Sequence, residues 1–428
     1  MARKGGYGKV DSKIVRDSTL TPESRLIYTI LATYSDKNRE SYPSIDQLIR
    51  DTGMMPAAGI APDSDVYLKT ECLQVTGSFK VRGAYYKISQ LAEEERAKGV
   101  IACSAGNHAQ GVALAAARSG VKSLICLPDG APISKVEATK ALGAEVCLVK
   151  GVYDDAYAKA LELKDSRGYT FIHPFDDVDV IAGQGTIGLE ILDQLPDVDI
   201  VLVPVGGGGL ISGLAFAIKS LRPEVKVYGV QASGAPSMFN SIRDKHIESL
   251  TGVSTIADGI AVKTPGEHTF GYVSKYVDGI VTVSEDEICS AILTLIEKHK
   301  MIAEGAGAVS VAAAMFGKVP LKGKKVCCLV SGGNIDVTIL SRVIKRGLLK
   351  SGRSYSLCIE LLDKPGQLKD VSRIIADEGG NVISVHHERG NENSDVNGCF
   401  LRLQLETRNF EHIESIRNAL RKEGFKLV

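Results

Sequence analysis

Short apolar runs alternate with amphipathic segments along most of the chain, from Val66 to about Lys350. The runs cover residues 100–103, 122–127, 145–149, 200–203, 225–230 and 325–330. Helical spacing of apolar residues is found between them, at 107–119, 134–142, 154–166 and 210–221. This alternation predicts an α/β fold whose parallel sheets are covered by helices on both faces, and ligands in such folds bind at the carboxyl ends of strands.

Residues 354–428 follow a second pattern. Strands are predicted at 354–361, 381–388 and 398–406, with amphipathic helices at 368–378 and 411–423 and a last strand at the C-terminus. The order β-α-β-β-α-β predicts a small ferredoxin-like unit.

Residues 1–55 form a short unit with a helical pattern. Leu26, Ile27, Ile30 and Leu31 share one face of a predicted helix, and Ser44 caps a second helical stretch. Residues 56–65 contain Pro, Gly, Ser and Asp and predict a linker.

Composition narrows the class of protein. The 428 residues carry a formal net charge of zero, so no overall attraction to nucleic acid or to an anionic membrane is expected. We expect neither a membrane span nor a signal peptide, because long apolar stretches are lacking. The nine cysteines include no Cys-x-x-Cys pair, which favours free thiols and a cytoplasmic location.

A first candidate for chemistry is Lys80, which follows the turn at residues 76–79 and opens a helical stretch. The field at a helix N-terminus favours the neutral amine, the form needed for Schiff-base chemistry. An ordinary surface lysine is the alternative.

Two glycine-rich turns follow predicted strands. Residues 104–111 contain small residues at a strand-to-helix turn, where backbone N–H groups can bind a carboxylate or phosphate. Residues 206–209 are four consecutive glycines before a helix, and their entropic cost favours a phosphate site over a purely structural turn. No Gly-Lys-Ser/Thr follows, so this is not a P-loop.

A last turn, at residues 329–334, places Ser331 among glycines after another strand. Taken alone, this segment is better explained as a plain tight turn.

Together these segments resemble the fold-type II pyridoxal-phosphate (PLP) enzymes, and among them the threonine dehydratases (threonine ammonia-lyases). Further matching segments, in the order of that family, are residues 173–177, 183–186, 257–262 and 304–308. The resemblance covers residues from about 66 to 350 and implies a two-lobed core similar to that of the tryptophan synthase β chain. The tail resembles an ACT regulatory domain.

The resemblance implies a role for each site residue. Lys80 would link covalently to the aldehyde of PLP, Asn107 would contact the ring oxygen, and Ser331 would face the pyridine nitrogen. The implied cofactor-binding residues are Phe79, Lys80, Asn107, Gly206, Gly207, Gly208, Gly209, Leu210, Ser331 and Gly332. The residues implied in binding the substrate carboxylate are Ser104, Ala105, Gly106, Asn107 and His108. For His108 a hydrogen-bonded turn histidine is the alternative.

The implied reaction is loss of water and ammonia from a hydroxy amino acid. Lys80 would remove the Cα proton, and L-threonine would give 2-oxobutanoate while L-serine gives pyruvate. A serine at the pyridine nitrogen is a weaker proton source than an aspartate, which favours loss of the β-hydroxyl over transamination. A serine racemase or a serine-only dehydratase is the alternative, and both isoleucine synthesis and threonine breakdown remain open as roles.

We predict no metal site. Some related enzymes, notably serine racemases, carry a divalent cation near the loop after the strand at 225–230. Residues 231–237 of this chain contain no acidic side chain, and hard cations prefer carboxylate oxygens.

The tail is expected to regulate the enzyme. Residues 363–368 resemble the ligand loop of ACT domains, and the candidate effector residues are Gly366, Leu368 and Asn381. Isoleucine and valine are the candidate effectors, and a dimerisation module that binds nothing is the alternative. The family resemblance also implies a homo-oligomer, a dimer or a tetramer.

The beginning of the chain departs from the dehydratase pattern. The resemblance implies an Arg-Thr-Pro-Leu segment and a sheet strand before Lys69, whereas residues 20–28 and 42–49 resemble a replication-initiator helix-turn-helix module. The groove-reading helix of such a module would follow Gly53, but Pro56 intervenes. We therefore expect nucleic acid not to be a partner, and we interpret the chain as a fusion of two truncated pieces. A DNA-binding protein with a silent enzyme domain, or an inactive sensor, is the alternative.

The expected organisation has four parts. They are a helix-turn-helix-like segment at 1–55, a linker at 56–65, a dehydratase domain at 66–350 and an ACT domain at 354–428.

Overall fold

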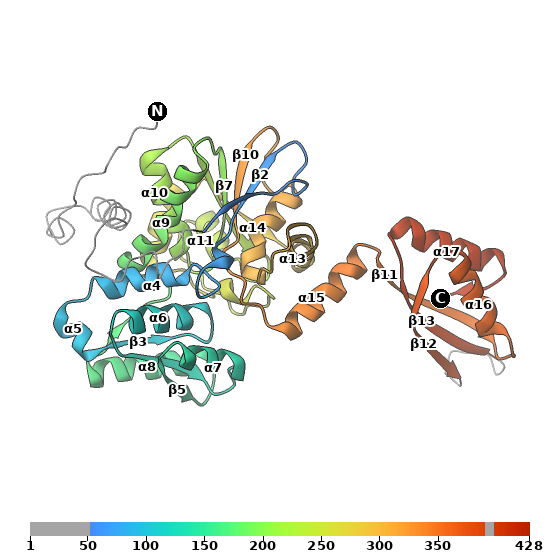
Figure 1. The fold of residues 1–428 in the computed structure, drawn as a ribbon, viewed down its shortest axis with the longest axis horizontal. Coiled ribbons are helices and arrows are strands. Elements are labelled where there is room, and N and C mark those ends of the chain that lie inside the picture. The colour runs from blue at the N-terminus through green and yellow to red at the C-terminus, as the bar shows by residue number, and fades with distance from the viewer. Residues whose placement is uncertain (1–51, 390–397) are drawn as a thin grey trace. The chain divides into compact units, whose positions relative to one another are not determined.

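The computed structural model describes residues 52–389 and 398–428, and Figure 1 shows the arrangement of its elements. The chain divides into two compact units, residues 1–335 and 336–428. The predicted helix-turn-helix-like segment lies outside the described residues except for its last four positions, 52–55.

A six-stranded sheet is the centre of one lobe of the first unit, with the strand order β1-β2-β10-β7-β8-β9. The strands are β1 (Met54–Pro56), β2 (Asp65–Lys69), β7 (Ile200–Pro204), β8 (Lys226–Ala232), β9 (Gly279–Val283) and β10 (Lys325–Leu329). All neighbouring strands are parallel except β1, which pairs antiparallel with β2. Residues 56–65, which the sequence pattern predicted as a linker, thus span the turn of the hairpin that β1 and β2 form at the edge of the sheet.

Helices cover this sheet as the apolar pattern predicts. Helices α9 (Val178–Gln194) and α10 (Gly209–Leu221) share one buried cluster with β7, β8 and β10. Helix α14 (Gly305–Met315) is almost entirely buried and packs along β7 to β10. Helices α11 (Ser237–Asp244), α12 (Glu267–Tyr276) and α13 (Glu285–His299) complete the lobe.

A four-stranded parallel sheet is the centre of the other lobe, with the order β5-β4-β3-β6. Its strands are β3 (Val100–Cys103), β4 (Ser123–Pro128), β5 (Glu145–Val149) and β6 (Thr170–Phe171). Alternate strand residues face α4 (Lys80–Ser89) and α6 (Asn107–Arg118) on one side and α8 (Tyr153–Arg167) on the other. The short helix α5 (Glu93–Lys98) follows α4 in the sequence, and the short helix α7 (Ile133–Ala141) follows β4.

A buried network of charges fixes the start of α4. Arg82, 1% exposed, donates hydrogen bonds to Glu71 and to Glu190 of α9, and Lys69 of β2 also reaches Glu190 at 2.6 Å. Removal of one partner from such a buried network leaves an uncompensated charge and costs about 3–5 kcal/mol. The network therefore holds the N-terminus of α4 firmly against β2 and α9.

The second unit contains the predicted β-α-β-β-α-β order. Its elements are α15 (Val337–Lys350), β11 (Ser354–Leu362), α16 (Gln367–Asp377), β12 (Asn381–Arg389), β13 (Gly398–Glu406), α17 (Phe410–Lys422) and β14 (Lys426–Leu427). The sheet is antiparallel with the order β12-β13-β11-β14, and its inner face shares a buried cluster with α16 and α17. Helix α15 falls in this unit, whereas the sequence pattern placed residues up to 350 in the predicted dehydratase domain.

Among the described residues, no helix is both long enough and apolar enough to cross a membrane.

Candidate active site

The candidate active site forms where the carboxyl ends of strands from both sheets of the first unit meet. Asn107 follows β3 of the smaller sheet, and Asn334 follows β10 of the larger one. Asn334 Nδ2 donates to Asn107 Oδ1 at 2.9 Å, which joins the two lobes directly. The parallel topology thus brings together turns that lie far apart in the sequence.

Lys80 is the first residue of α4, and its side chain turns into this region. Its Nζ donates a 2.8 Å hydrogen bond to Pro174 O in the segment after β6, and it lies 5.4 Å from the centre of the Phe79 ring. Loss of hydration lowers the pKa of the amine to about 8, partly opposed by the carboxylate of Glu304. A substantial fraction of this amine is therefore neutral and nucleophilic near physiological pH.

The four glycines at 206–209 form the turn between β7 and α10. Gly208 has a φ of +100°, and a Cβ on Gly207 would lie 2.5 Å from the Phe175 ring. Thr269 Oγ1 donates to Gly207 O at 2.6 Å and holds the turn in place. Because glycines carry no side chain and the first N–H groups of a helix have no partner within it, this turn has backbone donors that can bind an anion.

The turn after β10 faces the start of α4. Phe79 N donates to Ser331 O at 3.1 Å, and Ser331 is 2% exposed with its Oγ 3.5 Å from Ala306 O. Ser78 is fully buried, and its Oγ has no hydrogen-bond partner among the described residues. A buried hydroxyl without a partner beside Lys80 fits a site whose polar complement comes from a bound group.

Glu304 is a functional candidate to which the sequence pattern assigned no role. It is 5% exposed, and its Oε1 accepts a 2.7 Å hydrogen bond from Asn107 Nδ2. Burial raises the pKa of this carboxyl to about 7, and the nearby carboxylate of Asp258 adds to the effect. In the sequence, Glu304 stands out only as part of the matching segment at 304–308. Its contact with Asn107 could not be predicted, because it joins two lobes and residues far apart along the chain.

The loop at 104–108 brings the predicted carboxylate-binding residues to the start of α6. Gly106 N donates to Ser104 Oγ at 3.1 Å. The His108 imidazole is buried and pairs with Ile172 O at 2.8 Å, and burial lowers its pKa to about 3. The ring is thus neutral and engaged with the backbone, so His108 can offer a substrate only its own backbone N–H.

Two of the three predicted effector residues of the second unit lie together. Gly366 and Leu368 line a cavity of about 440 Å³. Asn381 does not line it; the residue pairs with Glu406 at the other end of β12, while Arg389 at the cavity end pairs with Cys399. Eight strand positions separate Asn381 from Arg389, a distance of roughly 25 Å.

The residues present fit PLP. Lys80 provides a desolvated amine, residues 206–209 provide backbone N–H groups at a turn where neighbouring residues leave no room for a Cβ, and Asn107 provides an amide oriented by Glu304. An amine on one turn and a candidate anion site on another match the two ends of this cofactor.

Comparisons with known proteins agree with this chemistry. The family described as "Pyridoxal-phosphate dependent enzyme" matches residues 45–332. The chain is 53% identical to an L-threonine ammonia-lyase of Thermotoga maritima, over 85% of this chain and 90% of that protein. It is 43% identical to an L-threonine ammonia-lyase of Geobacter sulfurreducens, over 94% of this chain and 98% of that protein.

Solved structures show the same fold. The processed form of threonine deaminase isoform 2 from Solanum lycopersicum has a TM-score of 0.71 and 39% identity, covering 78% of this chain and 90% of that one. The maize serine racemase has a TM-score of 0.68 and 32% identity, covering 75% of this chain and 97% of that one.

Proposed function

The chain belongs to the pyridoxal-phosphate dependent enzymes, and from this premise we propose that it converts L-threonine, and also L-serine, into a 2-oxo acid and ammonia. The observation that carries the proposal is the Lys80 amine, whose pKa is lowered to about 8. It donates a hydrogen bond to Pro174 O, and the next residue, Phe175, lies against the four-glycine turn. Relatives that are 43–53% identical over most of the chain are L-threonine ammonia-lyases.

The cofactor contacts come from four turns. Lys80 would hold the aldehyde end, Gly206 to Gly209 and Leu210 the phosphate, and Asn107 the ring oxygen. Ser331 and Gly332 would lie at the pyridine nitrogen, with Phe79 beside the ring. Bound PLP supplies an electron-withdrawing group that acidifies the Cα–H of the substrate.

Lys80 is the proposed base for the Cα proton of the substrate. Once its amine is free and neutral, Lys80 Nζ would accept the Cα proton, and the β-hydroxyl would leave as water by taking up the proton that Nζ returns. The released enamine tautomerises and hydrolyses to the 2-oxo acid and ammonia. In the structure, Lys80 Nζ donates a hydrogen bond to Pro174 O, which holds the amine in place before the cofactor binds.

Substrate orientation comes from the loop at 104–108. Its backbone N–H groups and the Ser104 hydroxyl bind the carboxylate of the amino acid, as helix N-termini do for anions generally. The neutral, buried His108 ring braces this loop through Ile172 O.

The decisive test is the reaction of the purified, PLP-loaded chain with L-threonine and L-serine, measured as 2-oxo acid formed. We expect 2-oxobutanoate and pyruvate respectively, and no D-serine. Production of D-serine without pyruvate would instead support a serine racemase, the activity of the 32% identical maize protein.

Lys80→Ala is expected to abolish both turnover and the visible absorbance of covalently bound cofactor. Lys164→Ala changes a lysine of α8 whose side chain is 44% exposed; it is the matched control and should leave both unchanged. Persistent deamination by Lys80→Ala would overturn the assignment of this residue.

The second unit is proposed to act as an ACT-type regulatory domain that binds an amino acid. Its β-α-β-β-α-β sheet and the cavity beside Gly366 and Leu368 support this proposal. A homo-oligomer is the expected state of the enzyme. All nine cysteines are free, which supports a reducing cytoplasmic environment.

A further inference from the structure

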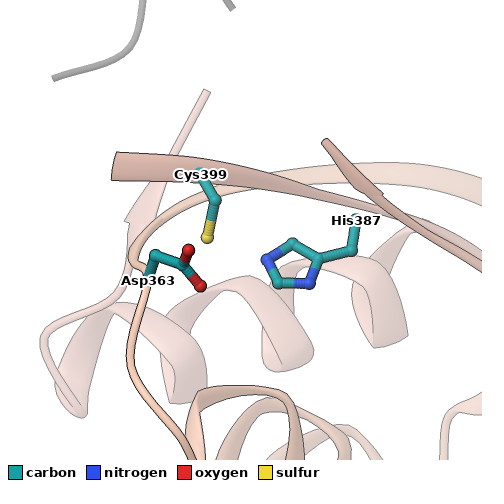
Figure 2. A group of neighbouring side chains, drawn as sticks. All are labelled: Asp363, His387 and Cys399. Atoms are coloured by element: carbon teal, nitrogen blue, oxygen red, sulfur yellow. The ribbon is translucent and has the colours of Figure 1, made fainter. Parts of the chain in front are cut away.

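Three side chains that can bind metal ions converge in the second unit. They are Asp363, His387 and Cys399, whose ligand atoms all lie within 4.8 Å of one another. Figure 2 shows the carboxylate, the imidazole and the thiol pointing toward a common space. In the part of the chain that the structure describes, these residues form the one group of three or more possible metal ligands. The sequence pattern predicted no metal site.

The antiparallel register explains why these residues meet. Cys399 on β13 pairs with Leu361 on β11 and with Arg389 on β12. His387 lies two positions before Arg389, on the same face of β12. Asp363 follows the end of β11 directly. Three adjacent elements thus present one ligand each at the same corner of the sheet.

The ligand atoms favour a borderline or soft divalent ion. Thiolate, imidazole and carboxylate are the ligands of zinc sites, whereas magnesium and calcium require oxygen ligands. In a tetrahedral zinc site, neighbouring ligand atoms lie roughly 3.4–3.6 Å apart. Asp363 and His387 are exposed, so their side chains can close the remaining gap of about 1 Å by rotation.

All three residues line the cavity of about 440 Å³ in the second unit. Three protein ligands beside a cavity leave the fourth position of a tetrahedral ion open to water or to an exogenous ligand. We propose that Asp363, His387 and Cys399 bind a zinc-class divalent ion with one coordination position open toward this cavity. The proposal concerns the second unit alone and does not depend on the reaction assigned to the first.

Two cationic side chains also line the cavity, and they oppose the binding of a metal ion. Arg389 Nε lies 3.0 Å from Asp363 Oδ2, with 68% of its side chain exposed, and Lys364 follows Asp363 in the chain. An exposed ion pair of this kind is worth about 0–1 kcal/mol, so Arg389 can swing into solvent. A divalent ion would take its place on the carboxylate and would deprotonate the Cys399 thiol on coordination.

The test uses the full, PLP-loaded chain with Zn²⁺ in competition with a chelating dye, and with Co²⁺ as a spectroscopic probe. We expect one tightly bound ion per chain and, with Co²⁺, a thiolate-to-metal absorption band. His387→Ala and Asp363→Asn should each weaken Zn²⁺ binding by about tenfold or more, since even loss of a residue that only orients a ligand costs about 10–100-fold. Arg389→Gln removes the competing cation and should tighten binding by about two- to fivefold.

Matched controls lie on the opposite face of the same sheet. His386 and Cys358 both pair with Arg402 of β13. Arg402 follows the inward-facing Leu401, so it and its strand partners face away from the core. His386→Ala and Cys358→Ser should bind Zn²⁺ as the unmodified chain does. Cys399→Ser should abolish the Co²⁺ thiolate band. Cys399 is buried in the core of this unit, so this variant can fail to fold. In that case Zn²⁺ binding by the variants of the exposed His387 and Asp363 tests the proposal.

The proposal is overturned if His387→Ala and Asp363→Asn bind Zn²⁺ as tightly as the unmodified chain. It is also overturned if the Co²⁺ band persists in a folded Cys399→Ser chain, or if Arg389→Gln binds Zn²⁺ more weakly. Activity with L-threonine is measured on the same preparations. A failure of the metal-binding proposal can therefore be distinguished from a failure of the proposed deamination.

Discussion

Burial moves the pKa values of Lys80 and Glu304 toward neutrality from opposite sides. Lost hydration lowers the pKa of the amine to about 8 and raises the pKa of the carboxyl to about 7. In both cases the low-dielectric surroundings disfavour the charged form. Pairs of groups shifted in this way are typical of active sites, where one group must gain or lose a proton at working pH.

The lowered pKa of Lys80 predicts how the apo chain takes up its cofactor. The neutral amine attacks the aldehyde, so the rate should rise as pH increases through about 8 and then level off. The measurement is the rate of appearance of bound-cofactor absorbance after PLP is added at a series of pH values. A midpoint near 10.5, the ordinary value for lysine, would contradict the desolvation described for this residue.

Glu304 is predicted to position Asn107 rather than to react itself. Glu304→Ala removes the acceptor of the 2.7 Å hydrogen bond and should lower kcat by about tenfold, since an unsatisfied buried donor costs about 1–3 kcal/mol. Glu304→Gln keeps an acceptor oxygen and should restore most of the rate. Steady-state kinetics with L-threonine, together with the cofactor spectrum, measure both effects. Equal loss in the two variants would indicate that the carboxylate charge, not the hydrogen bond, is required.

At the scale of elements, helix N-termini and strand ends create the site. Lys80 and Asn107 are the first residues of α4 and α6, and Gly209 is the first residue of α10. Each helix follows a turn that its own sequence predicts. What joins them is the contact between turns, such as the pairing of Ser78 with Gly332.

Gly207→Ala is predicted to weaken cofactor binding. Its Cβ would lie 2.5 Å from the Phe175 ring, closer than any real side-chain contact, so the turn or the Phe175 segment must shift. We expect PLP affinity to fall by about tenfold or more, since a displacement near 1 Å can cost about 100-fold in a positioned site. Equilibrium dialysis or cofactor fluorescence measures the change.

Gly271→Ala provides the control for this change. Gly271 lies inside α12, and a Cβ there would meet nothing within 4 Å. This substitution should leave PLP affinity unchanged and stabilise the chain by about 0.5–1 kcal/mol, since alanine favours a helix interior. If both variants bound PLP equally well, the anion site assigned to the four-glycine turn would be wrong.

At the scale of the whole molecule, the chain consists of two units with separate hydrophobic cores. The inner faces of β11 and β13, together with α16 and α17, enclose the core of the second unit without residues of the first. A separate core is what an independently folding regulatory domain requires.

The separate core leads to a prediction about regulation. L-Isoleucine or L-valine should inhibit deamination of L-threonine by the full chain, and deletion of residues 336–428 should abolish that inhibition while turnover persists. The measurement is an effector titration during turnover for both chains. Inhibition that survives the deletion would place the effector site in the first unit instead.

Much of this architecture is predictable from local pattern alone. The alternation of apolar runs and helices predicted β3, β4, β5, β7, β8 and β10, because period-2 and period-3.6 patterns are properties of neighbouring residues. It did not predict β6 and β9. The motifs at 76–80 and 206–209 likewise marked the amine and the candidate anion site, since glycines and a lysine at helix starts have local physical reasons. The strand at 54–56 lacked such a signal, because its three residues gain their partners only from β2.

The sequence by itself determined the family and the two kinds of sheet, and it marked Lys80 as the candidate amine, because each depends on residues close together along the chain. Only the tertiary structure decided that Glu304 accepts a hydrogen bond from Asn107. It also decided that the His108 ring is hydrogen-bonded to Ile172 O. The distance between Asn381 and Gly366 likewise depends on the tertiary structure. The same is true of Asp363, His387 and Cys399, whose meeting depends on the register of three strands. Local pattern sets which face of a strand is buried, but register and crossover set which distant side chains meet.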